Sequence, residues 1–181
     1  MDSVANKTRH KCFISYHHAD EAEVEAFIQQ FDHNRDVFIA RGIGAGMTGD
    51  IIASTNDDYI KQQIRTKYLR DTTVTIVLVG RETWKRRFVD WEIAASLRNT
   101  STSSASGVLA ITLPSVENYS DLKAPARLLD NLDGTDGYAV WWKYPDSAEV
   151  LAAMIDWAYD ARASKTDLRN NSRLLRKHNA L

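Results

Sequence analysis

The segment that most constrains the fold of this chain is residues 73–79, TVTIVLV, where every residue except Leu78 is β-branched. β-Branched side chains favour extended backbone, and a mostly apolar run without polar alternation is typical of a parallel strand covered on both faces. Gly80 ends the run. The segment therefore predicts the central strand of a mainly parallel sheet, which needs neighbouring strands at both edges and helices on both faces.

Strand-like and helix-like segments alternate along the rest of the chain. Short apolar runs predict four more strands, at residues 12–16, 37–40, 108–113 and 138–142. Apolar residues at helical spacing predict helices at residues 21–31, 57–69, 81–98 and 147–163, with a shorter one near 124–129. Asp20 and Ser147 stand where helix-capping side chains are preferred. This alternation predicts the α/β class, as a flavodoxin-like three-layer sandwich with a five-stranded, mainly parallel sheet.

Composition narrows the class of protein further. The 181 residues include 23 Lys and Arg against 24 Asp and Glu, which argues against a surface devoted to nucleic acid. Cys12 is the one cysteine, so an intrachain disulfide and a four-cysteine zinc site are excluded. The first ten residues hold no apolar run, and the longest apolar stretches are too short to cross a bilayer. We therefore expect a cytoplasmic protein with no nucleic-acid partner, no membrane association and no bound metal.

These patterns divide the chain into three parts. Residues 1–10 are an N-terminal extension, residues 11–163 form the folded domain, and residues 164–181 form a basic tail. We expect the tail to be solvated and partly frayed, with a marginal amphipathic helix as the alternative. Inside the domain, residues 100–106, TSTSSAS, are low in complexity and predict a flexible loop.

Ligands of open parallel sheets bind at the carboxyl ends of the strands, so the loops that begin at Tyr16, Arg41 and Gly80 are candidate sites. Residues 44–49, GAGMTG, match the dinucleotide pattern G-x-G-x-x-G. The helix that should open inside that pattern is expected only near residue 57. A mobile surface loop whose glycines permit positive φ is therefore favoured over a dinucleotide site.

Two histidines, His17 and His18, follow the first strand together with Asp20. Adjacent histidines on an extended turn do not easily face one metal ion, and no third ligand is evident. A polar turn that leads into a helix is the simplest interpretation. A turn that lines a substrate site is the alternative, because it stands at the carboxyl edge of the sheet.

The helix expected at residues 81–98 carries the candidate for catalysis, Glu92. A mostly aromatic stripe runs along this helix at helical spacing, formed by Trp84, Phe88, Trp91 and Ala95. Glu92 would lie beside the stripe, where a carboxylate is either functional or desolvated and paired. Helical geometry alone favours a surface Glu92 that pairs with Lys85 or with a neighbouring arginine.

Residues 75–93, TIVLVGRETWKRRFVDWEI, resemble the signature of the TIR-like family of bacterial Thoeris anti-phage systems, the ThsB family. The pattern is an apolar strand ending in glycine, then threonine, arginine, an aromatic residue, valine and aromatic-Glu-Ile. Residues 13–17, FISYH, and Asp20 resemble the first strand and turn of the same family. The resemblance covers about residues 11–160 and identifies the domain as TIR-like.

The resemblance implies a TIR-type fold and an enzyme that cleaves NAD between nicotinamide and ribose, with NAD as substrate and no cofactor. Enzymes of this kind use a glutamate on the helix after the third strand, and Glu92 matches that position. The implied product is a cyclic isomer of ADP-ribose, a diffusible signal that activates a separate effector protein, which depletes NAD. The alternative is a non-catalytic TIR-like module that works by self-association.

A closed pocket with aromatic walls would favour cyclisation, because it folds the dinucleotide back and excludes water. The candidate substrate-binding residues are Tyr16, His17, Arg41, Trp84 and Trp91, with Trp142 as a further wall. We expect Tyr16 and His17 to line the same cleft as Glu92, because the strands that they follow are expected to be neighbours.

Overall fold

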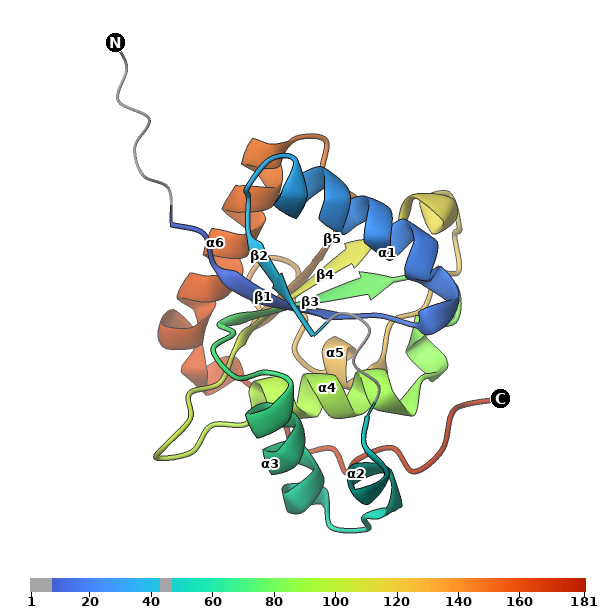
Figure 1. The fold of residues 1–181 in the computed structure, drawn as a ribbon, viewed down its shortest axis with the longest axis vertical. Helices are drawn as coiled ribbons and strands as arrows, with labels where there is room; N and C mark the ends of the chain where they lie inside the picture. The colour runs from blue at the N-terminus through green and yellow to red at the C-terminus, as the bar shows by residue number, and fades with distance from the viewer. Residues whose placement is uncertain (1–7, 43–46) are drawn as a thin grey trace.

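The computed structural model describes residues 8–42 and 47–181, which form one sheet between two layers of helices (Figure 1). The strands are β1 (Lys11–Ser15), β2 (Ile39–Arg41), β3 (Val74–Val79), β4 (Gly107–Thr112) and β5 (Ala139–Trp142). They lie in the order β2-β1-β3-β4-β5, and all neighbours are parallel. This order is that of the flavodoxin-like fold, so the predicted fold class is confirmed.

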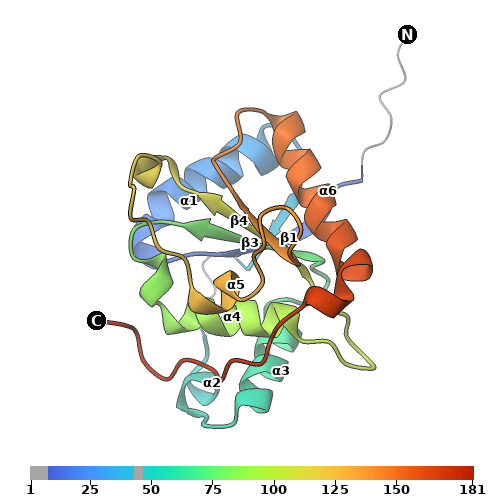
Figure 2. The ribbon, with the colours of Figure 1, turned by 180° about the vertical axis from the view of Figure 1, so that it is seen from behind.

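Six α-helices of the described residues cover the two faces of the sheet. They are α1 (Glu21–Ile28), α2 (Gly49–Ala53), α3 (Asp57–Lys67), α4 (Arg87–Leu97), α5 (Ala126–Leu129) and α6 (Ala148–Ser164). A π-helical turn, Gln29–His33, extends α1. Figures 1 and 2 show α1 and α6 on one face and α3, α4 and α5 on the other, with α2 beside α3.

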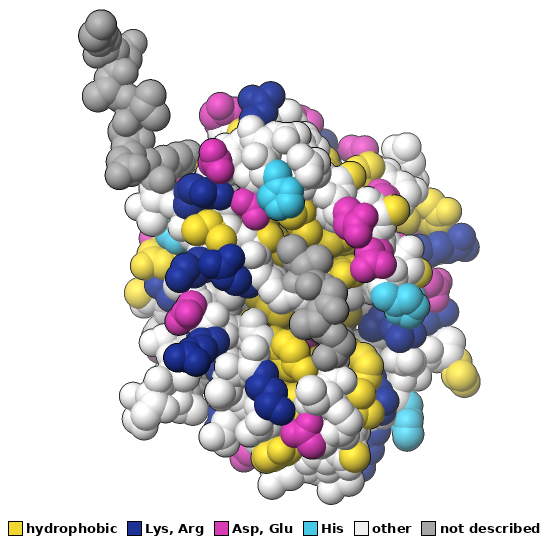
Figure 3. Space-filling view, in the orientation of Figure 1, with side chains coloured by type: hydrophobic (Ala, Val, Ile, Leu, Met, Phe, Trp, Pro, Cys, Tyr) yellow, Lys and Arg dark blue, Asp and Glu magenta, His cyan; other side chains and the backbone are white. Residues whose placement is uncertain are grey.

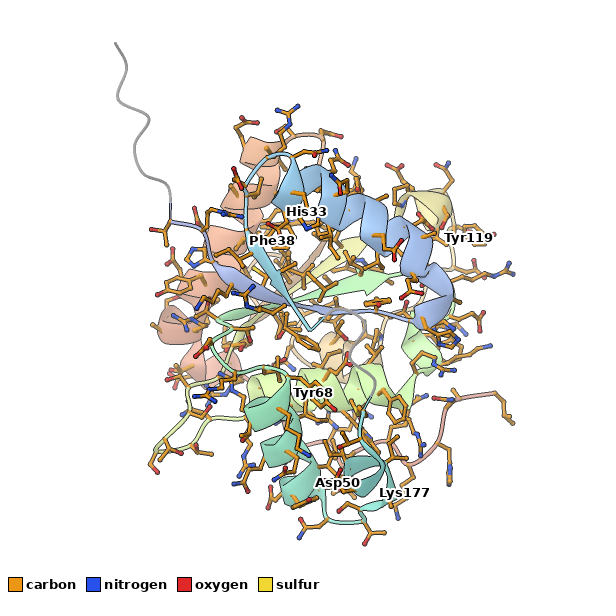
Figure 4. All side chains as sticks on the ribbon, in the orientation of Figure 1. His33, Phe38, Asp50, Tyr68, Tyr119 and Lys177 are labelled. Carbon is orange, nitrogen blue, oxygen red and sulfur yellow. The ribbon has the colours of Figure 1, made fainter. Side chains whose placement is uncertain are left out.

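Alternate residues of β3 contribute to different hydrophobic clusters. Ile76 and Leu78 belong to the cluster under α1 and α6, whereas Val77 and Val79 belong to the cluster under α4. Phe38, labelled in Figure 4, is fully buried in the first cluster. All residues of β3 are buried, so the lack of polar alternation in its sequence follows from its central place in the sheet.

The helix expected over residues 81–98 is broken into two pieces. Thr83–Lys85 forms a 3-10 turn, and Arg86 is extended, at φ −83° and ψ 121°, before α4 begins. The break lies at Arg86, and the fully buried Thr83 fixes the turn that precedes it, because its hydroxyl accepts a hydrogen bond from the Gly80 amide at 2.8 Å. Residues before the break therefore do not continue the face of α4.

The two capping predictions have different outcomes. Ser147 caps α6 as predicted, because its hydroxyl accepts a hydrogen bond from the Val150 amide at 3.2 Å. Asp20 precedes α1, but its side chain caps no amide, so that prediction is wrong. The Asp20 carboxylate lies instead against Gly80, where an added Cβ would fall 2.2 Å from Oδ2. A side chain at position 80 would therefore displace the Asp20 carboxylate.

Two predicted segments fall partly outside the described residues. Of the glycine-rich segment 44–49, the structure describes residues 47–49, and a helix, α2, begins at Gly49, earlier than expected. That helix has only five residues. Of the N-terminal extension, the structure describes residues 8–10, and Arg9 pairs with Asp32 at 2.9 Å. Within the part of the chain that the structure describes, no helix is long and apolar enough to cross a membrane.

The basic tail is not frayed, so that prediction is wrong. After a 3-10 turn at Thr166–Leu168, residues 169–181 run without regular secondary structure past α5 and α4 (Figure 2). Arg127 of α5 is buried and donates to the carbonyls of Arg173 and Leu174, at 2.7 and 3.0 Å. Such anchors are backbone carbonyl groups, which every residue has, so the tail sequence shows no pattern that reveals them.

Candidate active site

A cavity of about 280 Å³ opens at the carboxyl edge of the sheet, where β1 ends beside β3. The turn after β1, residues that follow β2, and the first half of α4 enclose it. Its lining includes Tyr16, His17, Arg86, Phe88 and Glu92. This place in the strand order is the switch point at which open parallel sheets usually bind ligands.

Glu92 lies in the second turn of α4, and its Oε2 accepts a hydrogen bond from Ser15 Oγ at 2.5 Å. Ser15 is the last residue of β1 and is fully buried. The hydroxyl of Ser96 donates to the Glu92 carbonyl at 2.7 Å and lies 2.6 Å from the hydroxyl of Thr75. These bonds fix α4 on β1 and β3 and hold the Glu92 carboxylate at the wall of the cavity.

Burial raises the pKa of Glu92 to about 8, and the hydrogen bond from Ser15 offsets part of this rise. No cation among the described residues forms an ion pair with Glu92. Lys85 pairs instead with Glu82, at 2.5 Å. The interpretation of Glu92 as a surface carboxylate paired with Lys85 or an arginine is therefore wrong.

Three nitrogen-bearing side chains, His17, His18 and Arg86, share the cavity with Glu92, and Glu21 is a second carboxylate in its lining. Burial, followed by the charges of Arg86 and His18, lowers the pKa of His17, so its imidazole is neutral at pH 7. The Nδ1 atom of His17 is buried and has no hydrogen-bond partner among the residues described. Arg86 lines the cavity from the extended residue before α4. The site therefore offers a guanidinium suited to a phosphate and an imidazole suited to a hydroxyl group.

Of the residues expected at the site, Tyr16, His17 and Glu92 do surround one cavity. Arg41 does not line it. Arg41 is an exposed residue of β2, and its guanidinium donates to the Ala40 carbonyl at 3.1 Å. The roles of the three residues that meet remain predictions, whereas the position expected for Arg41 is wrong.

The tryptophans expected as walls of the site lie elsewhere. Trp84 lies in the 3-10 turn, where the ammonium groups of Lys85 and Lys123 are 5.6 and 4.6 Å from its ring centre. Trp91 is 3% exposed, and its Nε1 donates to the Arg176 carbonyl at 2.7 Å. A wall role for these tryptophans needs an unbroken helix over residues 81–98 and a tail that leaves Trp91 free. In the structure the helix is broken at Arg86, and the tail bonds to Trp91.

The sequence pattern does not reveal several residues of the site, which include Ser15, bonded to Glu92, and the lining residues Arg86, Phe88, Glu21 and Met47. Ser15 was placed in a strand without a role, although a hydroxyl at the carboxyl end of an apolar run is a usable signal. Arg86 and Phe88 were assigned to a helix face rather than to the site. Their position follows from the break before α4, which no periodicity shows. Trp142, a further expected wall, packs on Trp157 with ring centres 5.9 Å apart.

Side chains of the types that bind metal ions also occur at this edge of the sheet. Within residues 8–42 and 47–181, no group of three or more His, Cys, Asp or Glu side chains could hold a metal ion. His17 and His18 stack edge to face, with ring centres 4.5 Å apart. The polar groups that the cavity offers are carboxylates, imidazoles and a guanidinium.

The fold and the cavity together define a TIR-type α/β domain with a partly buried glutamate at the carboxyl edge of its sheet. The family model described as Thoeris protein ThsB, TIR-like domain, matches residues 13–118. The match spans more than half of the chain and includes the last three residues of β1, all of β3, and Glu92. The chain therefore belongs to the ThsB TIR-like family, as the sequence resemblance predicted. A comparison with curated proteins gives no match.

Proposed function

We propose that this chain cleaves NAD between nicotinamide and ribose, with Glu92 as the catalytic carboxylate. We also propose that the product is a cyclic isomer of ADP-ribose, which activates an effector NADase in Thoeris defence. The observation that carries the proposal is the state of Glu92, a carboxyl group desolvated at a cavity wall and bound by one hydroxyl. Membership of the Thoeris family supports the biological part of the proposal.

The chemistry requires little more than one well-placed carboxylate. Nicotinamide in NAD carries a positive charge and leaves as a neutral molecule, so it needs no general acid. Positive charge then develops on the ribose, as in glycoside hydrolysis. An ionised Glu92 beside the ribose would stabilise this charge, and a desolvated carboxylate does so more effectively than one in water.

The substrate itself would help to ionise Glu92. With a pKa of about 8, roughly a tenth of the carboxyl groups are ionised at pH 7 in the free protein. A nicotinamide cation bound nearby lowers the pKa of a carboxyl group. Binding of NAD would therefore produce the charged form where it is needed. Because the free protein must first lose this proton, kcat/KM for NAD should rise as the pH approaches 8.

Cyclisation and hydrolysis differ in the nucleophile that reaches the ribose. In cyclisation the bond to nicotinamide breaks, a hydroxyl group of the ADP-ribose part forms the new bond to the anomeric carbon, and its proton is released. The Glu92 carboxylate is suited to accept that proton. A cavity of about 280 Å³ is small for a ligand site, so we expect it to enclose the nicotinamide riboside half. Arg86 is the candidate partner of the diphosphate.

The test compares Glu92→Gln with Glu82→Gln, since Glu82 lies on the same connection, is half-exposed and pairs with Lys85 outside the cavity. Purified proteins are incubated with NAD, and lysates of phage-challenged cells are assayed for a new cyclic nucleotide. We expect Glu82→Gln to behave as the unmodified chain and Glu92→Gln to produce no signal and no protection. A folded Glu92→Gln protein that still protects cells would contradict catalysis and would support the self-associating module instead.

A further inference from the structure

A second cavity, of about 440 Å³, lies at the edge of the sheet opposite to Glu92, and the proposed reaction does not use it. We call it the amino-edge pocket. The second half of α3, the turn from α3 to β3, the end of α4 and the loop before β4 enclose it. Its charged lining consists of Arg65, Arg70, Arg98 and Asp71. In Figure 3, separate Lys and Arg side chains lie down the left, the side on which α3 and this loop lie in Figure 1, and others lie on the right.

Arg65 is partly withdrawn from solvent and fastens the loop before β4 to α3. Its Nε donates to Ser103 Oγ at 2.9 Å, its Nη1 donates to Ser106 Oγ at 2.7 Å, and its Nη2 donates to the Ser104 carbonyl. Burial is the main cause that lowers the pKa of Arg65, and the nearby Arg162 adds to it. A guanidinium has five N–H groups, so these three bonds leave one on Nη1 and one on Nη2 for a ligand.

Among the described residues, the amino-edge pocket has an excess of positive charge, with three arginines against one aspartate. None of its three arginines forms an ion pair there. Arg98 donates to the Asp58 carbonyl at 3.1 Å, while the carboxylate of Asp58 pairs with Lys61. Asp71 is the one acidic side chain in the lining. A partly buried guanidinium with neutral partners only is costly, and a bound anion would offset that cost.

We propose that the amino-edge pocket binds a small anion that carries two or more phosphate groups. Guanidinium groups match phosphate oxygens in pairs, and the hydroxyls of Thr66, Thr100 and Thr102 line the same cavity as further donors. The lining contains no aromatic side chain, so it offers no surface on which a base could stack. The volume lies within the usual range of ligand sites and exceeds the space that a single phosphate needs.

This site is separate from the Glu92 cavity. Asp71 precedes the amino end of β3, whereas Gly80 follows its carboxyl end. A strand of six residues spans about 20 Å, so a substrate held beside Glu92 does not occupy the amino-edge pocket. The two proposals can therefore fail independently of one another.

The test is a calorimetric titration of the full chain with inorganic pyrophosphate at low ionic strength. We expect saturable binding that weakens with added salt, because exposed charges are screened. The double variant Arg70→Gln/Arg98→Gln should lose about tenfold or more in affinity, since it removes two charge-assisted contacts. Arg35→Gln removes the same kind of charge from an exposed position outside the pocket and should leave the affinity within about twofold.

A second measurement locates the bound anion without any substitution. Hydrogen exchange of the unmodified chain should slow at residues 67–73 and 98–106 when pyrophosphate binds. Arg86→Gln and Glu92→Gln should retain this binding, because both residues line the other cavity. The proposal is overturned if pyrophosphate does not bind, if the double variant binds it unchanged, or if Arg86→Gln abolishes binding.

Discussion

Two carboxylates of α4, Asp90 and Glu92, are only two residues apart and have opposite surroundings. Asp90 is 5% exposed and accepts hydrogen bonds from Arg127 Nε at 2.8 Å, from Arg127 Nη2 at 3.3 Å, and from the Arg176 amide at 2.9 Å. Glu92 accepts one hydrogen bond, from Ser15, and forms no ion pair with any of the residues described. Residues i and i+2 of an α-helix are about 200° apart around its axis, so the side chains of Asp90 and Glu92 leave opposite sides of α4.

The comparison shows that α4 carries a paired carboxylate on one side and, on the other, the unpaired carboxylate that we propose for catalysis. On the Asp90 side, the charge is fully paired and ties the tail to α4 and α5. On the Glu92 side, burial without a cation leaves a carboxyl group whose ionisation depends on what enters the cavity. A paired carboxylate stabilises the fold, whereas an unpaired one is available to a cationic substrate.

The largest effect is expected on the paired side. Asp90→Ala leaves the guanidinium of Arg127 buried without a counter-charge, which costs about 3–5 kcal/mol of unfolding free energy. Denaturant unfolding of the variant measures this loss. Asp136→Ala removes an exposed carboxylate and should change the unfolding free energy by at most about 0.5 kcal/mol. Equal stability of the two variants would contradict the structural role of Asp90.

The next effect is expected on activity. Glu92→Gln keeps the shape of the side chain and its capacity for hydrogen bonding but removes the charge. The loss of transition-state stabilisation should be about 3 kcal/mol or more, roughly a hundredfold or more in the rate of NAD cleavage. The rate is measured beside a thermal melt. A variant that melts early but turns over normally would reverse the comparison between the two carboxylates.

The stability of the chain should also depend on pH through Glu92. Its folded pKa of about 8 lies above the unfolded value near 4.5, so the folded state binds more protons between these two values. The stabilising contribution of Glu92 is therefore present below about pH 4.5 and is lost as the pH rises through 8. Relative to the unmodified chain, Glu92→Gln should gain roughly 4 kcal/mol between pH 5 and pH 9. Parallel stability curves for the two proteins over this range would show that Glu92 is not desolvated.

The smallest effect concerns the serine that bonds to Glu92. Ser15→Ala removes the hydrogen bond that favours the ionised carboxylate, so the pKa of Glu92 should rise further. The midpoint of the rise of kcat/KM with pH should move upward by about one unit, or about 1.4 kcal/mol. Ser172→Ala, at an exposed position of the tail, should leave the profile unchanged. A profile that does not move with Ser15→Ala would separate this serine from the ionisation of Glu92.

Prediction from sequence succeeded where a pattern repeats locally and failed where distant segments meet. The central strand followed from β-branched residues, and its neighbours followed from alternation with helices. Arg41, Trp84 and Trp91 were assigned to the site because helix 81–98 was assumed to be continuous and loop ends were assumed to converge. That helix is broken at Arg86, and the bond between the Thr83 hydroxyl and the Gly80 amide that fixes the preceding turn has no periodic signature.

The sequence by itself determined the fold class, the order of its elements, the family, and Glu92 as the candidate for catalysis. These depend on local conformational preference and on short motifs that a chain carries whatever its neighbours are. Only the tertiary structure decided that Glu92 is desolvated, that Ser15 and Arg86 share its surroundings, and that the tail is docked through Arg127. Burial, pairing and the loss of solvent are properties of the space between distant segments, and that space exists only once the chain has folded.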